Sequence, residues 1–99
     1  MSMSPTQELL ARMRKLKRKI MKRYKAKEIE LFGSVVRGEQ SGASDIDLLV
    51  EFEEGADLLD LTGLAIFLEE ELGRKVDVVP KRALREELRQ SVLREAVRL

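Results

Sequence analysis

The sequence predicts a mixed α+β domain in which helices and strands follow one another in the order α-β-α-β-α-β-α. Apolar residues recur at helical spacing in three stretches, and short strand-like runs separate them. Glycine or proline residues stand at most of the junctions. At 99 residues the chain has the length of one domain, so we expect residues 1–99 to fold as a single unit.

A basic amphipathic helix is predicted from about residue 5 to residue 25. Ser4 is a suitable N-cap, Pro5 fits the first helical position, and Gln7 completes a capping box. The apolar stripe consists of Leu9, Leu10, Met13, Leu16, Ile20, Met21 and Tyr24. The other face is rich in lysine and arginine, which most simply indicates a solvated surface.

The first strand is predicted over residues 27–32 and is broken by Gly33 and Ser34. Ser34 is a natural N-cap for a short helix over residues 35–39. A helix N-terminus offers N–H groups and the positive end of a dipole, which suit phosphate, and glycine lets a ligand approach the backbone. An ordinary strand-to-helix turn remains the alternative interpretation.

Two common nucleotide-binding motifs are excluded. Gly33 and Gly38 have the glycine spacing of a P-loop, but Glu39 stands where that motif requires its phosphate-binding lysine. No GxGxxG sequence occurs, so the dinucleotide fingerprint is absent as well.

The second strand, predicted from about residue 44 or 45 to residue 52 or 53, carries two carboxylates near its start. Asp45 and Asp47 project from one face, roughly 7 Å apart, because side chains alternate along a strand. Two neighbouring carboxylates repel one another unless a cation lies between them. We therefore expect a divalent-metal site that faces the predicted phosphate-binding turn.

The third helix is predicted to start at Asp57 as N-cap and to end at Gly73. Its apolar stripe comprises Leu58, Leu61, Ala65, Leu68 and Leu72, with Leu64 and Phe67 beside it. A third strand over residues 75–79 is ended by Pro80 and carries one charge, Asp77. Taken alone, Asp77 most simply lies at an exposed edge. Taken with the two earlier aspartates, it is a candidate third metal ligand.

A last helix is predicted from about residue 82 or 83 to residue 93, with Leu84, Leu88 and Val92 on its inner face. Residues 95–99 either continue this helix or form a short terminal strand. The sequence leaves both possibilities open.

Composition excludes several kinds of chemistry. The chain contains no cysteine and no histidine, which removes disulfides, thiolate and histidine metal sites, and nucleophilic triads. No apolar run approaches the ~18 residues of a membrane span, and the N-terminus does not resemble a signal peptide. We expect a cytoplasmic protein without membrane contact.

The net charge of +1 conceals a strong asymmetry. Residues 1–27 carry ten basic and one acidic side chain, whereas residues 28–99 carry nine basic and seventeen acidic ones. A positive arm on a negative body suggests an anionic ligand or partner near the arm and cation binding in the body.

The order Gly33-Ser34, ten residues, then Asp45-Ile46-Asp47 between two predicted strands resembles the nucleotidyltransferase superfamily of DNA polymerase β. The short chain and the wording GSVVRGE…SDIDLLVEF resemble its minimal nucleotidyltransferase branch, whose members are commonly paired with HEPN-domain ribonuclease toxins. The resemblance implies a small mixed sheet of three to four strands with helices packed on it.

The resemblance also implies roles for individual residues. Gly33 and Ser34 match the pair that holds the nucleotide phosphates, and Asp45 and Asp47 match carboxylates that bind two divalent ions, usually Mg²⁺. Asp77 matches the third carboxylate, which completes one metal site and helps to activate the attacking hydroxyl. The role of Arg37 is left open: it is either a phosphate ligand or the partner of Glu39 or Glu30 in an ion pair.

Three functions are consistent with these observations. The first is transfer of a nucleoside monophosphate, AMP from ATP, to a hydroxyl such as a tyrosine of a HEPN toxin, which would neutralise the toxin. The second is a non-catalytic antitoxin that acts by binding the HEPN partner. The third, least favoured, is nucleic-acid binding through the basic helix, with an affinity that falls as salt rises. A larger partner or self-association would be needed to enclose a nucleotide fully.

Overall fold

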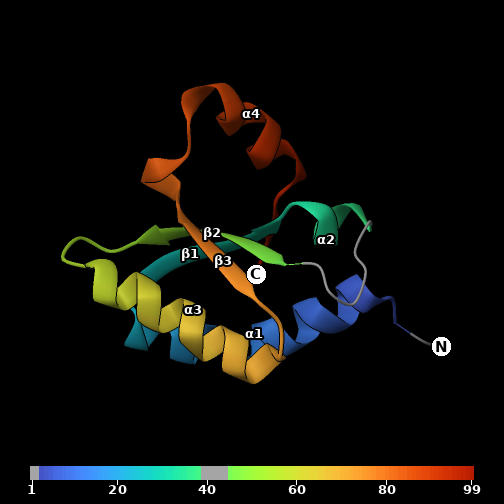
Figure 1. Cartoon of the computed structure of the whole chain (residues 1–99), viewed down its shortest axis with the longest axis horizontal. Helices are drawn as coiled ribbons and strands as arrows, with labels where there is room; N and C mark the ends of the chain where they lie inside the picture. Colours follow the sequence, from blue (N-terminus) through green and yellow to red (C-terminus); the bar gives the residue numbers. More distant parts are fainter. Residues whose placement is uncertain (1–2, 39–44) are drawn as a thin grey trace.

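The computed structural model describes residues 3–38 and 45–99, which form a four-stranded sheet flanked by helices (Figure 1). The elements are α1 (Pro5–Arg23), β1 (Ala26–Phe32), α2 (Ser34–Arg37), β2 (Ile46–Phe52), α3 (Leu58–Leu72), β3 (Val76–Pro80), the 3-10 helix η1 (Lys81–Ala83), α4 (Glu86–Glu95) and β4 (Val97–Arg98). The predicted α+β class and element order are confirmed, with one short strand added at the C-terminal end.

The sheet is mixed, and its strands lie in the order β3-β2-β1-β4. Strand β2 pairs antiparallel with β1 on one side and parallel with β3 on the other. A parallel pair requires a crossover connection, and α3 supplies it. The short β4 pairs antiparallel with the free side of β1.

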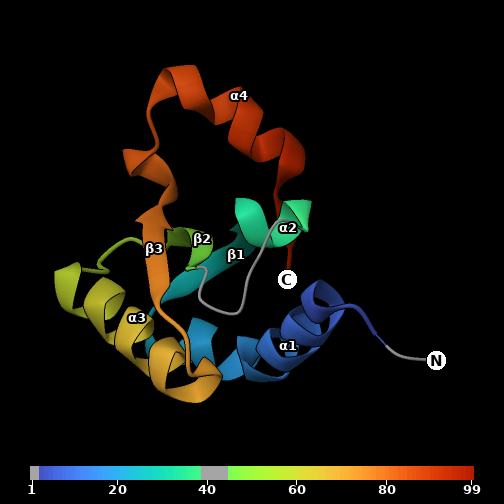
Figure 2. The ribbon, with the colours of Figure 1, turned by 45° about the vertical axis from the view of Figure 1, so that its right-hand side comes forward.

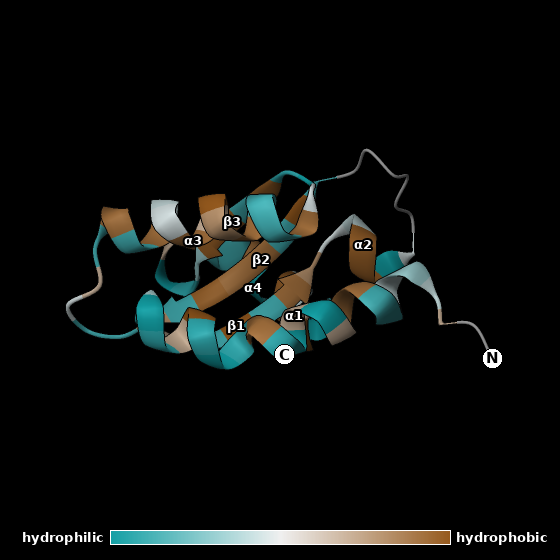
Figure 3. Cartoon of the chain, turned by 90° about the horizontal axis from the view of Figure 1, so that it is seen from below, coloured by the Kyte–Doolittle hydropathy of each residue, from teal (hydrophilic) through white to brown (hydrophobic). Residues whose placement is uncertain are grey.

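Helices α1 and α3 cover one face of the sheet, whereas α4 stands over the other (Figures 1 and 2). Figure 3 views the α1 and α3 face and shows the apolar strand β2 between the two helices. The fully buried side chains of this core are Met13, Ile20, Ile29, Leu31, Val35, Ile46, Leu48, Val50, Leu64 and Leu68. Burying each of the larger apolar side chains contributes about 1.5–3 kcal/mol to stability.

The predicted starts of α1 and α3 are confirmed. The Ser4 hydroxyl accepts the Gln7 N–H at 3.1 Å, and the Gln7 side chain accepts the Ser4 N–H at 3.0 Å. Asp57 and Asp60 form the same reciprocal pair at the start of α3, and Gly73 ends that helix with φ 66°. Local side chains thus satisfy backbone groups that a helix leaves free at its ends.

The predicted apolar stripe of α3 is wrong at its first position. Leu58 is 75% exposed, whereas Leu64, placed at the side of the stripe, is fully buried. Leu58 and Leu59 are the first two residues of α3, and both are largely exposed. The later positions Leu68 and Leu72 are buried as predicted.

The predicted inner face of the last helix is wrong at Leu88, whereas Leu84 and Val92 are partly buried. Helix α4 contributes no buried residue, and Leu88 is 47% exposed. The helix starts later than predicted, at Glu86, because residues 81–83 form η1 first. The 3-10 helix η1 thus precedes α4, which stands over the face of the sheet opposite α1 and α3 (Figure 2).

The chain end resolves the question that the sequence left open. Residues 97–98 form β4, and the Leu99 N–H donates to the Ile29 carbonyl at 3.0 Å. The Leu99 side chain joins the core. Pro80 does not stop β3 but is its last residue, opposite Val50. Its missing N–H is tolerated because β3 lies at the edge of the sheet.

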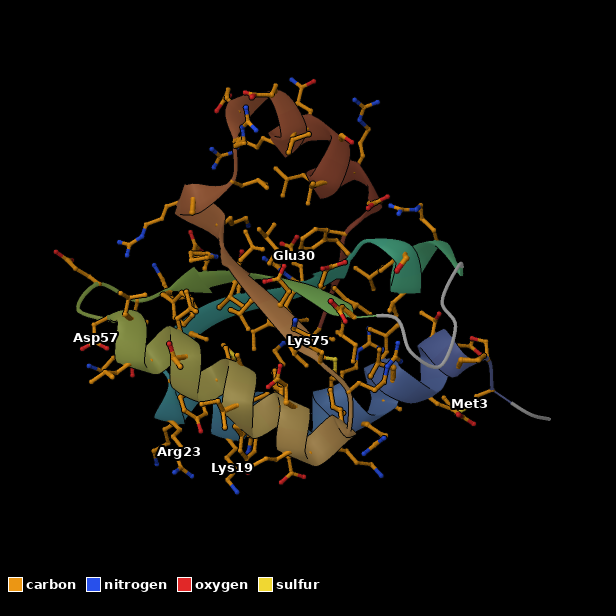
Figure 4. All side chains as sticks on the ribbon, in the orientation of Figure 1. Met3, Lys19, Arg23, Glu30, Asp57 and Lys75 are labelled. Atoms are coloured by element: carbon orange, nitrogen blue, oxygen red, sulfur yellow. The ribbon has the colours of Figure 1, made fainter. Side chains whose placement is uncertain are left out.

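No helix within residues 3–38 and 45–99 is long and apolar enough to cross a membrane. The basic residues Lys19 and Arg23 point away from the sheet on the outer side of α1 (Figure 4). A role for this side of α1 in binding an anionic partner stays a prediction.

Two substitutions in α3 test this arrangement of the core. We expect Leu64→Ala to lower the free energy of unfolding by about 2–4 kcal/mol, because it leaves a cavity at a fully buried site. Leu58→Ala removes the same atoms from an exposed site and should cost less than about 0.5 kcal/mol. Urea denaturation followed by circular dichroism measures both, and equal losses would contradict the packing described.

Candidate active site

The predicted site residues meet at one end of the three longest strands. Gly33 follows the last residue of β1, and Phe32 of β1 lies opposite Asp47 in β2. On the other side of β2, Asp47 lies opposite Asp77 in β3. Asp45 directly precedes β2. The register of the central strand thus brings segments that are far apart in the sequence to one edge.

Gly33 lies directly against the Asp47 carboxylate. A β-carbon at position 33 would be 2.3 Å from the Oδ2 atom of Asp47, far inside contact distance. Gly33 also has φ 84° and ψ −157°, a conformation that essentially only glycine adopts. The backbone geometry and the contact therefore both require glycine at the turn where the sequence predicts phosphate binding.

The pKa of Asp47 is raised by burial and by neighbouring like charges. Partial burial raises the pKa of Asp47, and the neighbouring carboxylates of Asp77 and Asp45 raise it further. The Arg37 guanidinium acts in the opposite direction and lowers this pKa. Three carboxylates thus share one region, and the repulsion between them favours binding of a cation.

The residue types fit a divalent metal ion, although the side chains are not gathered around one position. Asp45 and Asp77 are exposed and Asp47 is half-buried. Within the described ranges 3–38 and 45–99, no group of three acidic side chains is close enough to enclose an ion. Oxygen ligands suit Mg²⁺, which keeps several waters and takes further oxygens from substrate phosphates. The metal-binding roles of the three aspartates stay predictions.

Ser34 does not cap the short helix as predicted. Gly33 is the N-cap, and Ser34 is the first residue of α2, which ends at Arg37 before Gly38. The helix is therefore shifted by one residue toward the N-terminus, because the positive φ of Gly33 already turns the chain. The predicted helix end at residue 39 lies outside the described residues.

Arg37 pairs with an acid that the sequence did not suggest. Its Nη1 atom lies 3.0 and 3.1 Å from the two carboxylate oxygens of Glu95, at the end of α4. The suggested pairing with Glu30 is not the one formed, since Glu30 contacts Lys81 at 3.4 Å. Figure 4 shows Glu30 on the side of the sheet that faces α4. Glu39, the other suggested partner, lies outside the described residues.

Glu95 also contacts the predicted phosphate turn. Its Oε1 atom accepts the backbone N–H of Gly33 at 3.1 Å as well as the Arg37 guanidinium. One sequence signal could have indicated such a role. An acid in the last turn of a helix is unfavourable to the helix dipole, which suggests a compensating tertiary partner.

Comparison with known proteins identifies the protein family to which this chain belongs. The model of the nucleotidyltransferase domain matches residues 13–99, most of the chain. The chain therefore belongs to the nucleotidyltransferase domain family, and it is a nucleotidyltransferase. The resemblance to this family lies in the glycine-serine turn and in Asp45 and Asp47 at the start of β2.

Individual relatives make the likeness more specific. The protein adenylyltransferase MntA of Thermococcus cleftensis is 40% identical over 97 residues, with 98% of each chain covered. A solved structure assigned to a minimal nucleotidyltransferase is 44% identical with a TM-score of 0.84, and the match covers 100% of both chains. These similarities confirm the predicted fold and the resemblance to minimal nucleotidyltransferases.

A third similarity is to a toxin–antitoxin complex. A chain of the complex between tri-AMPylated Shewanella oneidensis HEPN toxin and MNT antitoxin is 28% identical, with a TM-score of 0.68. The match covers 94% of the chain described here and 70% of that chain.

Substitution of the two positive-φ glycines around α2 tests the contact with Asp47. We expect Gly33→Ala to lower the free energy of unfolding by about 2–4 kcal/mol, since backbone strain and the clash with Asp47 add together. Gly38→Ala is the matched control, because a β-carbon there meets nothing within 4 Å and only the αL conformation is penalised, by about 1–2 kcal/mol. Thermal unfolding compares the two, and a Gly33 variant as stable as the Gly38 variant would contradict the contact.

The raised pKa of Asp47 predicts that its charge destabilises the fold in the absence of divalent ions. A carboxyl whose pKa is higher in the folded than in the unfolded chain costs stability above the folded pKa, and the cost disappears as pH falls below both values. Asp47→Asn should therefore raise the free energy of unfolding at pH 7 in EDTA, and with it the melting temperature, by less than about 1 kcal/mol in free energy because the site is partly solvated. At pH 3 the two proteins should melt together. A lower melting temperature for the variant at pH 7 would contradict the raised pKa of Asp47.

Proposed function

We propose that this nucleotidyltransferase transfers AMP from ATP to a hydroxyl group of a HEPN-domain toxin and thereby acts as its antitoxin. One observation carries the proposal: the sheet register places Asp47 beside Asp77, two residues after Asp45, and the Gly33 turn lies directly against the Asp47 carboxylate. The protein adenylyltransferase activity named for the Thermococcus relative and the AMPylated toxin in the Shewanella complex support the choice of reaction and partner.

The reaction is a displacement at the α-phosphorus of ATP. The acceptor oxygen forms a bond to that phosphorus, the bond to the bridging oxygen toward the β-phosphate breaks, and pyrophosphate leaves. Bound divalent cations, Mg²⁺ in our proposal, would supply positive charge that neutralises the phosphates during this displacement. Phosphoryl-type transfer asks the protein mainly for position and charge neutralisation, so a site without histidine is sufficient.

The chain's own residues divide this work. Asp45, Asp47 and Asp77 would hold the cations, and Asp77, on the edge strand β3, would take the proton from the acceptor hydroxyl. The absence of a side chain at Gly33 lets the phosphates approach the backbone, and the Ser34 hydroxyl donates to them. Arg37 contributes positive charge beside the carboxylates.

Transfer of labelled AMP tests the proposal directly. The protein is incubated with α-labelled ATP, Mg²⁺ and a HEPN-domain protein of the same organism. We expect label on the HEPN protein and a fall of at least about 100-fold with Asp45→Asn/Asp47→Asn, since the lost metal interactions are worth several kcal/mol. Glu53→Gln/Glu54→Gln removes two exposed acids from the β2–α3 turn and serves as the charge-matched control.

The result separates enzyme from simple binder. If wild type transfers no more label than the double aspartate variant, the enzymatic proposal is wrong. Should that variant still protect cells from the toxin, the protein acts by stoichiometric binding instead. A tyrosine acceptor is tested by replacing each tyrosine of the HEPN protein with phenylalanine and locating the modification by mass spectrometry.

A further inference from the structure

The Glu95 carboxylate contacts both ends of the short helix that carries the predicted phosphate turn. Its Oε1 atom accepts the N–H of Gly33, which precedes α2, at 3.1 Å. The same carboxylate binds the guanidinium of Arg37, the last residue of α2, at 3.0 and 3.1 Å. A single side chain, 62 residues away from Gly33 in the sequence, therefore spans the whole helix.

Helix α2 needs such support. It contains four residues, and an isolated helix of that length is unstable because nucleation fixes several residues for one hydrogen bond. It also starts from a glycine in a conformation with positive φ, where the unfolded chain has much freedom to lose. A charge-assisted contact at each end restricts both the turn and the arginine.

The position of Glu95 is set by β4 and not by the helix to which it belongs. Helix α4 has no buried residue, so it cannot hold its last residue by packing. Two residues beyond Glu95, however, Val97 pairs with Leu31 of β1, and the Leu99 side chain is buried in the core. Glu95 is thus fixed beside β1, from whose end Gly33 continues.

Arg37 interacts with Glu95 on one side and with the charge of Asp47 on the other. It is bound to Glu95, and its charge also lowers the pKa of Asp47. A guanidinium that moved onto Asp47 would neutralise a carboxylate that the proposed function needs for a cation. The ion pair with Glu95 opposes that movement and holds the guanidinium at the end of α2.

We propose that Glu95 is a positioning residue for the nucleotide, holding Gly33 and Arg37 in the arrangement that receives the triphosphate. This inference rests on the proposed function. It changes the role predicted for Gly33, because the Gly33 N–H donates to Glu95 and is not available to a phosphate. Gly33 then contributes its lack of a side chain, and Ser34 supplies the contact to phosphate.

A double-mutant cycle between Glu95 and Arg37 tests the inference. We expect Glu95→Ala to raise the KM for ATP and the Kd for Mg²⁺–ATP about 10-fold, with a smaller change in kcat, because charge-assisted contacts are lost. Glu95→Gln keeps the shape and an acceptor oxygen and should have an intermediate effect. In an Arg37→Ala background, Glu95→Ala should change the Kd by less than it does in wild type, since only its contact with the Gly33 N–H is left to lose.

Hydrogen exchange at the Gly33 amide provides a test that does not depend on activity. Its hydrogen exchange in Glu95→Ala should be at least about 10-fold faster than in wild type, since the amide loses its acceptor. Glu87→Ala is the matched control: it breaks an exposed ion pair with Arg85 on the same helix and should leave exchange, Kd and KM unchanged. Melting temperatures are measured for every variant, so that a loss of Kd caused by unfolding is recognised.

The outcomes separate this inference from the proposed function. If wild type binds Mg²⁺–ATP but transfers no AMP, the proposed function is wrong while the Kd cycle still decides the role of Glu95. The inference is overturned if both Glu95 variants bind ATP as wild type does, or if they bind it more tightly, as a carboxylate that merely blocks the phosphate site would require. The inference is also overturned if the effects of the two substitutions on the Kd are fully multiplicative. It is overturned as well if wild type does not bind ATP.

Discussion

The close approach of Gly33 to Asp47 is the constraint on which the site depends. A β-carbon at position 33 would occupy the space of the Asp47 carboxylate, and the backbone there has a conformation that other residues avoid. The turn after β1 can therefore lie against the first residues of β2. That contact brings a predicted phosphate-binding backbone and a predicted metal ligand within reach of one substrate.

The central strand β2 accounts for both the stability and the chemistry of this region. Its apolar residues Leu48, Leu49 and Val50 are almost completely buried, and they anchor the strand between β1 and β3. The same anchoring holds Asp47 beside Asp77, where burial and mutual repulsion raise its pKa. The hydrophobic core thus supplies the free energy that keeps like charges together.

The C-terminal segment connects the edge of the sheet to the site. Helix α4 packs poorly, yet the strand that follows it is paired with β1, and its last side chain lies in the core. Glu95 stands just before that strand and reaches the turn at Gly33 and the arginine of α2. Two distant parts of the chain are joined through one carboxylate.

The sequence by itself determined the element order, the capped starts of α1 and α3, and the candidate residues Gly33, Ser34, Asp45, Asp47 and Asp77. These features follow from local spacing, capping chemistry and a motif that lies within a short stretch of chain. Only the tertiary structure decided the exposure of Leu58, the poor packing of α4, the pairing of β4 and the partner of Arg37. Each of these depends on which surfaces meet across the sheet, and helical or strand periodicity carries no information about such long-range contacts.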